Sequence, residues 1–238
     1  MSSHEIHTRR PTWALLLPLL FCANLAWAQA PGQDPLQWPQ GCDAAEADPD
    51  GAAAVRIPAL NEAQMNAEEK QAAQSIASGP RGCIFGPFSL LARSPELLNR
   101  AQKLGEYLRF HAALPMKERE LAMLITGRVQ QSQYVWYIHE PIALKAGVSR
   151  PIVEDLAAGK RPAAMDGDEA AVYDFLEELA NRHAVGDAAY TAVRSRFGEK
   201  GTLDLVGIYA YFSLLALEMN VAGTPLPKGV KVPFAQVH

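Results

Sequence analysis

The sequence of 238 residues contains only three cysteines, too few for a dense disulfide scaffold or for a four-cysteine zinc site. Basic residues are not in excess either. The 22 Lys and Arg against 26 Asp and Glu give a net charge of −4, which argues against a surface that binds nucleic acid. Glycine and proline, 17 of each, are too few for a collagen-like or low-complexity chain. The length allows one large domain or two small ones.

Several motifs of well-known catalytic sites are also missing. The chain has no G-x-G-x-x-G, no Walker loop, no H-E-x-x-H, no C-x-x-C and no G-x-S-x-G elbow. The six histidines are scattered, and no pair of them has the spacing of a zinc site. We therefore expect no bound metal.

Long hydrophobic runs are absent except at the N-terminus. Arg9 and Arg10 precede an apolar run at 13–25, and the small-x-small pattern Ala-Trp-Ala follows at 26–28. This order is typical of a secretory signal peptide, and the run is shorter than the roughly 20 residues that span a bilayer. We predict a signal peptide at 1–28, export to the periplasm and no membrane span in the mature protein. An uncleaved anchor is the alternative.

Residues 29–84 are predicted to form a Pro- and Gly-rich arm with a short helix. Removal of the signal peptide leaves two cysteines, Cys42 and Cys83. In an oxidising compartment these are expected to form a disulfide that joins the arm to the start of the domain. The alternative is a pair of free thiols.

From Phe85 onward the apolar residues recur with the three- and four-residue spacing of helices, and no useful stretch alternates with a period of two. Before this point, 61–78 can form the short helix of the arm. The later helices are predicted at about 95–108, 117–131, 134–146, 149–159, 166–179, 188–197 and 203–220. The sequence thus predicts an all-α, single-domain helical bundle with an extended N-terminal arm.

Two side chains suited to acid–base chemistry fall on consecutive predicted helices. Glu120 lies among apolar neighbours, and His139 shares a helix face with Val135 and Ser132. A short connection would fold the two helices antiparallel and bring the carboxylate to the imidazole. Such a pair is a general acid–base arrangement. The ordinary alternative is a surface acid and a histidine packed in the core.

The same region resembles the carboxymuconolactone decarboxylase family, which also contains the alkylhydroperoxidase D-like proteins. The resemblance covers roughly 85–228 and leaves 229–238 as a tail. Its specific part consists of Arg119-Glu120, the pattern Tyr134-x-Trp136-x-x-His139, and then Ala143 and Gly147. The resemblance implies the helical bundle of this family, with self-association into trimers or hexamers.

The peroxidase branch of the family uses a Glu, a C-x-x-C pair and a His. Glu120 and His139 match the first and last of these, whereas Ser132 and Val135 occupy the two cysteine positions. Neither residue can attack a peroxide or resolve a sulfenic acid. The resemblance therefore favours the decarboxylase branch, which needs no thiol.

That branch implies a cofactor-independent reaction on a small cyclic carboxylate or lactone. His139 would carry the proton and Glu120 would orient it. Tyr134 would donate a hydrogen bond to developing negative charge. Arg128 is the candidate cation for the substrate carboxylates, and a solvated surface arginine is its alternative. The predicted substrate-binding set is Tyr134, Trp136, Ser132 and Arg128.

Export is unexpected for a decarboxylase of aromatic catabolism, so the lactone itself stays open. Two other functions also stay open. One is an antioxidant protein of the alkylhydroperoxidase or peroxiredoxin type, which the missing C-x-x-C disfavours. The other is a non-catalytic, oligomeric protein that binds a small ligand in an aromatic cleft.

Overall fold

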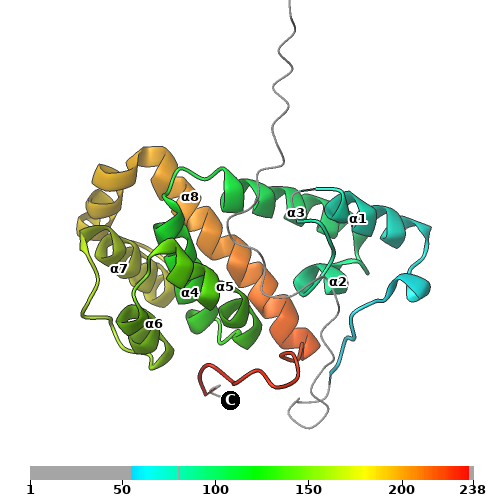
Figure 1. The fold of residues 1–238 in the computed structure, drawn as a ribbon. Coiled ribbons are helices and arrows are strands. Elements are labelled where there is room, and N and C mark those ends of the chain that lie inside the picture. The colour runs from blue at the N-terminus through cyan, green and yellow to red at the C-terminus, as the bar shows by residue number, and fades with distance from the viewer. Residues whose placement is uncertain (1–54, 80, 236–238) are drawn as a thin grey trace, which may run out of the picture. The chain divides into compact units, whose positions relative to one another are not determined.

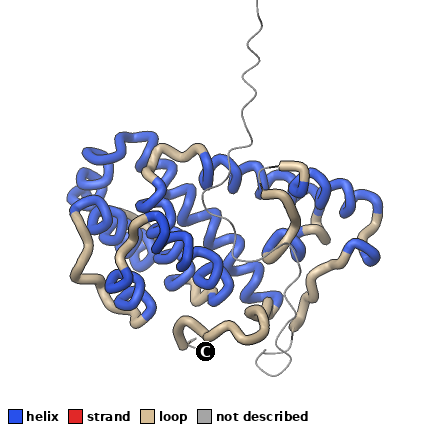
Figure 2. The backbone as a smooth tube through the Cα atoms, viewed as in Figure 1, coloured by secondary structure: helices blue, strands red, loops and turns tan. Residues whose placement is uncertain are grey.

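The computed structural model describes residues 55–79 and 81–235. The predicted signal peptide, most of the arm with Cys42, and the last three residues lie outside them. Within the described residues the secondary structure is helical and contains no strand, as Figure 2 shows, which confirms the all-α prediction. In chain order the elements are η1 (Glu62–Gln64), α1 (Ala67–Ala77), α2 (Pro87–Leu91), α3 (Pro95–Phe110), α4 (Met116–Val129), α5 (Gln133–Ala146), α6 (Arg150–Ala157), α7 (Gly167–Arg182) and α8 (Asp187–Ala222).

Helix α8 is the central element of the bundle. It packs against α2, α3, α4, α5 and α7, and Figure 1 shows α1–α3 on one side of it and α4–α7 on the other. By length and composition this helix is apolar enough to cross a membrane. In this fold, however, its apolar side chains such as Leu205, Ile208 and Leu215 are buried in the core. Burial of this kind is the main stabilising contribution to a helical bundle.

Glycines mark two helix ends that the sequence predicted. Gly147 has φ 107° and caps α5 in the left-handed conformation, which suits a residue without a Cβ. Gly198 has φ 71° and ψ −179° inside α8. Gly198 therefore separates two helical parts of α8, which correspond to the helices predicted at 188–197 and 203–220, although the second part begins earlier than the apolar pattern suggested.

Residues before Phe85 also contribute to the core. Met65, Ala72 and Ile76 are buried in the main hydrophobic cluster, and α1 packs against α3. The backbone N–H groups of Arg56 and Ile57 both donate to the carbonyl of Ala222 at the end of α8. The described part of the predicted arm is thus attached to the helical domain by apolar packing and backbone hydrogen bonds.

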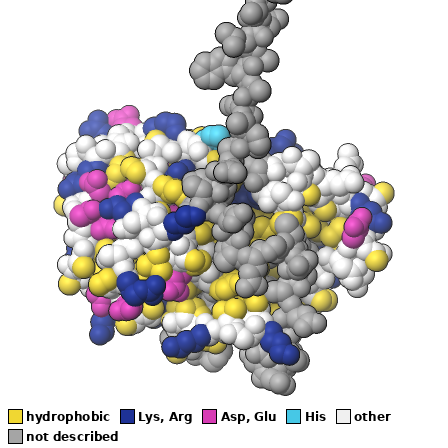
Figure 3. Space-filling view, in the orientation of Figure 1, with side chains coloured by type: hydrophobic (Ala, Val, Ile, Leu, Met, Phe, Trp, Pro, Cys, Tyr) yellow, Lys and Arg dark blue, Asp and Glu magenta, His cyan; other side chains and the backbone are white. Residues whose placement is uncertain are grey.

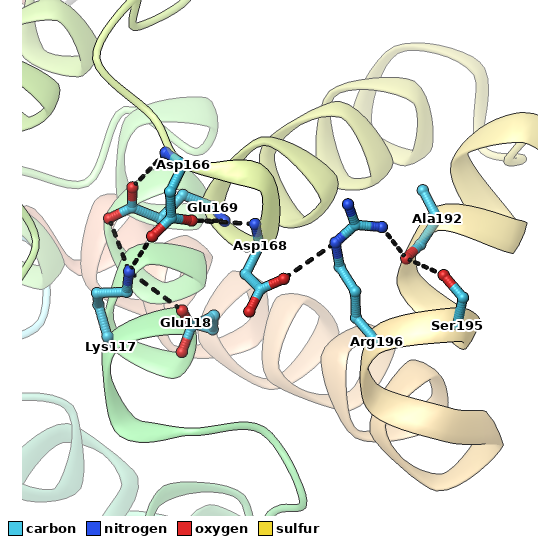
Figure 4. Close-up of polar contacts among 8 residues, drawn as sticks. All are labelled: Lys117, Glu118, Asp166, Asp168, Glu169, Ala192, Ser195 and Arg196. Carbon is cyan, nitrogen blue, oxygen red and sulfur yellow. Dashed lines mark hydrogen bonds and ion pairs between the residues drawn. The ribbon is translucent and has the colours of Figure 1, made fainter.

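A cluster of charged residues joins the beginnings of α4 and α7 (Figure 4). The Nζ of Lys117 lies 2.6 Å from Asp166 Oδ2 and 3.5 Å from both Glu118 Oε1 and Glu169 Oε1. Asp166 and Glu169 form a capping box at the start of α7, in which each side chain accepts a hydrogen bond from the other's backbone N–H. One lysine therefore neutralises two buried carboxylates and fixes a helix end.

Candidate active site

Helices α4 and α5 form an antiparallel pair in close contact. A Cβ atom at Gly127 would lie 3.1 Å from Cγ1 of Val135, so glycine allows the two helices to approach closely. Gln131 turns the chain with a φ of 54°, and the Oγ of Ser132 accepts a hydrogen bond from the N–H of Val135 at the start of α5. This connection sets the register of α5 along α4.

This register brings Glu120 of α4 to His139 of α5. The Nδ1 of His139 lies 2.8 Å from Oε2 of Glu120, and the two residues are only 4% and 2% exposed. The imidazole also packs edge-to-face on Phe212 of α8, with ring centroids 5.0 Å apart. The described residues offer no hydrogen-bond partner to Nε2, and His139 lines a pocket. The carboxylate thus holds one ring nitrogen and leaves the other for a ligand.

The pocket has a volume of about 460 Å³, its mouth included. It lies where the two groups of helices meet on α8, and its residues come from the loop before α2, from α2, α3, α5 and α8. Most of its wall is apolar and aromatic, with Phe85, Phe88, Ile138 and Phe212 among the lining side chains. A small apolar cavity with a few polar groups is the usual form of a site for an organic ligand.

Two tyrosines supply hydroxyl groups to this pocket. Burial raises the pKa of Tyr134 to about 12, with a smaller contribution from Tyr137. Burial likewise raises the pKa of Tyr211 to about 12, although Arg81 opposes the change. Both hydroxyls therefore stay protonated at neutral pH and can donate hydrogen bonds. Gly86 leaves room for the Tyr134 ring, since a Cβ atom at Gly86 would lie 2.8 Å from that ring.

Two arginines, Arg81 and Arg109, also line the pocket, and each is only 7% exposed. The guanidinium of Arg81 lies 4.6 Å from the ring centroid of Phe88, and that of Arg109 lies 5.1 Å from the ring centroid of Phe110. Among the described lining residues there is no carboxylate. The guanidinium of Arg81 in this lining is suited to a ligand that carries negative charge.

Glu218, one turn after the pocket residue Leu215, is a half-buried acid that affects stability. Burial raises its pKa to about 6 in the folded protein, and its Oε2 has no hydrogen-bond partner among the described residues. The ionised folded form is thus penalised above pH 6, whereas the protonated form below pH 4.5 is not. We expect Glu218→Gln to raise the free energy of unfolding by about 1 kcal/mol at pH 7.5. Urea titrations at both pH values should show that this gain disappears near pH 4.5.

The structure places three predicted ligand residues away from the pocket. Ser132 is buried at the start of α5, and the Nε1 of Trp136 donates to Glu140 at 2.9 Å. Arg128 donates to the carbonyl of Ala157 and stacks on Phe234. None of the three lines the cavity, because each points from its helix toward another part of the core. Of the predicted substrate-binding residues, only Tyr134 lines the cavity.

Sequence reasoning missed Arg81, Arg109, Tyr211 and Phe212 as pocket residues. The available signal was Gly105 in the middle of a predicted helix. A Cβ atom at that position would lie 2.1 Å from the hydroxyl oxygen of Tyr211, so the glycine marks the close approach of a side chain from another helix.

The cysteine and metal predictions concern other parts of the chain. Cys83 is disulfide-bonded, whereas Cys42 lies outside the described residues, so their pairing stays a prediction. Among the described residues no group of three or more His, Cys, Asp or Glu side chains is arranged to hold a metal ion.

Comparison with known proteins shows a partial match to one family. The model of the carboxymuconolactone decarboxylase family matches residues 95–178, which include both Glu120 and His139. No curated protein matches the chain.

Solved structures share the fold. The alkylhydroperoxidase AhpD core of an uncharacterized peroxidase-related protein from Ralstonia eutropha JMP134 has a TM-score of 0.59 and 22% identity, over 74% of this chain and 94% of that one. A peroxidase-related protein from Silicibacter sp. TM1040 has a TM-score of 0.59 and 16% identity, over 77% and 96%. The debrominase Bmp8 in complex with 2,3,4-tribromopyrrole has a TM-score of 0.54 and 13% identity, over 76% and 95%. Similarity at these identities shows a common fold.

Proposed function

We propose that this chain, whose residues 95–178 match the model of the carboxymuconolactone decarboxylase family, is a member of the carboxymuconolactone decarboxylase and alkylhydroperoxidase D-like superfamily and an enzyme that needs no cofactor. Its reaction is proton transfer, coupled to decarboxylation, on a small cyclic carboxylate or lactone. The observation that carries this proposal is the buried hydrogen bond of 2.8 Å between Glu120 and His139, beside an apolar pocket with cationic groups.

The proposed chemistry uses both nitrogens of His139. We assign the proton on Nδ1 to the hydrogen bond with Glu120, and this carboxylate stabilises the imidazolium when Nε2 also carries a proton. The bond between the ring carbon and the substrate carboxylate breaks, CO2 leaves, and the electron pair spreads into the lactone as a dienolate. The Nε2–H then gives its proton to the γ carbon.

The pocket side chains support this step in two ways. The hydroxyl of Tyr134, which stays protonated, can donate to the oxygen on which negative charge develops. The aromatic and apolar wall limits the contact of the dienolate with water, which favours delivery of the proton from His139 to carbon.

The test is turnover of a panel of cyclic lactone acids in D2O, followed by NMR for CO2 loss and for deuterium at carbon. We expect one or more compounds to react with the wild-type protein and with His111→Ala, which alters an exposed histidine. His139→Ala should react at least tenfold more slowly. A compound that binds in the pocket but neither loses CO2 nor exchanges protons would favour the alternative of a non-catalytic binding protein.

Thiol-dependent peroxide reduction is not expected from this pocket. The described lining contains no cysteine, and Ser132 and Val135 stand where the peroxidase branch has its thiols. We expect no consumption of tert-butyl hydroperoxide above the rate of buffer with dithiothreitol or a thioredoxin system. A rate that depends on the protein and is lost in Cys83→Ser would contradict this prediction.

We also propose that the protein is exported to the periplasm and works there on a small molecule. The N-terminal pattern of two arginines, an apolar run and small residues supports this location. Fractionation of cells that express the full chain, with N-terminal sequencing, tests it. We expect a periplasmic product that begins after Ala28.

We also propose that the protein self-associates through an exposed apolar face of α8. Leu203, Leu214, Leu217 and Val221 lie on one face of α8, and Leu217 and Val221 are 51% and 58% exposed. Figure 3 shows hydrophobic side chains gathered across the middle of the view, in the region that α8 crosses in Figure 1. Exposed apolar stripes of this kind are typical of interfaces.

We therefore expect a trimer or hexamer by light scattering. Leu217→Lys should shift the protein toward the monomer, because a charge would be buried in the interface. Ser195→Lys, on the polar first part of α8, should leave the assembly unchanged. A monomeric wild-type protein would contradict the prediction.

A further inference from the structure

Arg81 carries a buried charge that no described residue pairs with. It lies between α1 and α2, before the segment that the family model matches, and its side chain lines the pocket. The guanidinium contacts the ring of Phe88, yet Arg81 forms no hydrogen bond or ion pair with any part of the described chain. Glu106 attracts it at longer range without forming an ion pair. Since an unpaired buried charge is costly, this arrangement favours the binding of an anion beside Arg81.

Tyr211 adds a second group with an unfilled hydrogen bond in the same place. Its hydroxyl is buried and has no partner among the described residues. The absence of a side chain at Gly105 leaves the space that this hydroxyl occupies. Arg81 and Tyr211 are close enough to interact electrostatically, and both line the pocket. A hydroxyl that stays protonated and a guanidinium together present donors without an acceptor.

We propose that Arg81 and Tyr211 form an anion subsite that holds a carboxylate of the ligand while another part of the ligand lies at His139. Phe212 connects the two positions, because its ring packs against His139 at 5.0 Å and against Tyr211 at 5.3 Å. The subsite and the imidazole therefore border the same pocket on either side of the Phe212 ring, so one cyclic acid in this pocket can contact both.

This subsite deepens the proposed function and differs from the sequence-based expectation that Arg128 binds the carboxylate. A guanidinium that binds a carboxylate stabilises the charged ground state more than the transition state in which this carboxylate leaves as neutral CO2. It therefore slows the loss of that carboxylate. The carboxylate at Arg81 thus anchors the ligand. The bond that breaks belongs to a different substituent, placed toward His139 and the apolar wall.

The test uses isothermal titration calorimetry with benzoate and with benzamide, its uncharged analogue of the same shape. We expect the wild-type protein to bind benzoate at least tenfold more tightly than benzamide. Arg81→Gln should weaken benzoate binding at least tenfold and leave benzamide binding unchanged. Tyr211→Phe, which removes only the hydroxyl, should weaken benzoate binding less. Arg81→Lys should keep part of the preference because it keeps the charge but loses the planar fork.

Arg100→Gln is the matched control, since Arg100 is an exposed arginine on α3 paired with Glu96. It changes the net charge equally and should not affect benzoate binding. The proposal is wrong if benzoate and benzamide bind equally, if benzoate does not bind, or if Arg81→Gln has no more effect than Arg100→Gln.

Benzoate binding and turnover can fail separately. If the histidine variant leaves every reaction unchanged while Arg81→Gln still weakens benzoate binding, the subsite stands and the proposed enzyme does not. If turnover depends on His139 but benzoate binding does not depend on Arg81 or Tyr211, the proposed enzyme stands and the anion subsite does not.

Discussion

Replacement of Glu120 by glutamine is expected to lower kcat roughly 10²–10⁴-fold with little change in KM. The variant keeps the size of the side chain but loses the negative charge at 2.8 Å from Nδ1 of His139. The neutral amide can donate to Nδ1 and so favour the tautomer with its proton on Nε2, and it no longer stabilises the imidazolium. Steady-state kinetics with the lactone acid that the wild-type protein turns over measure the effect.

The matched control for this variant is Glu154→Gln, an exposed glutamate on α6, which should keep wild-type kinetics. Benzoate affinity should be nearly unchanged in Glu120→Gln, because the carboxylate lies behind the imidazole and the proposed anion subsite lies across Phe212 from it. A fall in benzoate affinity as large as the fall in kcat would indicate a general disturbance of the pocket and contradict the role of Glu120 as an orienting group.

The helices and the Glu120–His139 contact were accessible from the sequence because each depends on local rules. Apolar spacing predicts where helices lie, and a short connection between two helices makes them antiparallel. The Nδ1 to Oε2 contact follows from this register. The resemblance to the family then favoured Glu120 and His139 among the scattered glutamates and histidines.

The cationic side of the pocket was not accessible in the same way. Arg81 lies on a loop, and its distance from α8 in space depends on how α1, α2 and α3 pack together. Arg128 shares a helix with Glu120, but its side chain points to Ala157 and Phe234. A shared helix does not imply a shared face, and the face of a mostly buried helix cannot be read from polarity alone.

The kink in α8 was accessible from the sequence as well. An apolar pattern interrupted by Gly198 and Gly201 predicts two helices, since glycine is a poor helix former. In the structure Gly198 has non-helical dihedral angles and separates the two helical parts of α8. Gly201, by contrast, is buried inside the second part, where tertiary packing outweighs a local preference of roughly 1 kcal/mol.

Lys117→Met is expected to have the largest effect on stability. The lysine is the cation that contacts Glu118 and Glu169, whose side chains are only 3% and 4% exposed, and also Asp166 (Figure 4). Burial alone would lower the pKa of Lys117, but the hydrogen bond to Asp166 and the charges of Glu169 and Glu118 outweigh it and raise the pKa. Removal of the cation leaves buried carboxylates without compensation, which should cost about 3 kcal/mol at pH 7.

Urea unfolding at several pH values tests this expectation, because the loss of stability should depend on pH. Burial already raises the pKa of Glu118, and loss of Lys117 raises it further, so protonation relieves the penalty as the pH falls. The difference in free energy of unfolding between the variant and the wild type should therefore be largest near pH 7 and smaller near pH 5.

Two further variants serve as controls. Lys117→Met/Glu118→Gln should recover part of the loss at pH 7, because it removes one of the uncompensated charges. Lys103→Met, an exposed lysine on α3, should differ from the wild type by less than about 0.5 kcal/mol. An equal loss at both pH values would mean that the lysine acts through its packed methylene groups and not through its charge.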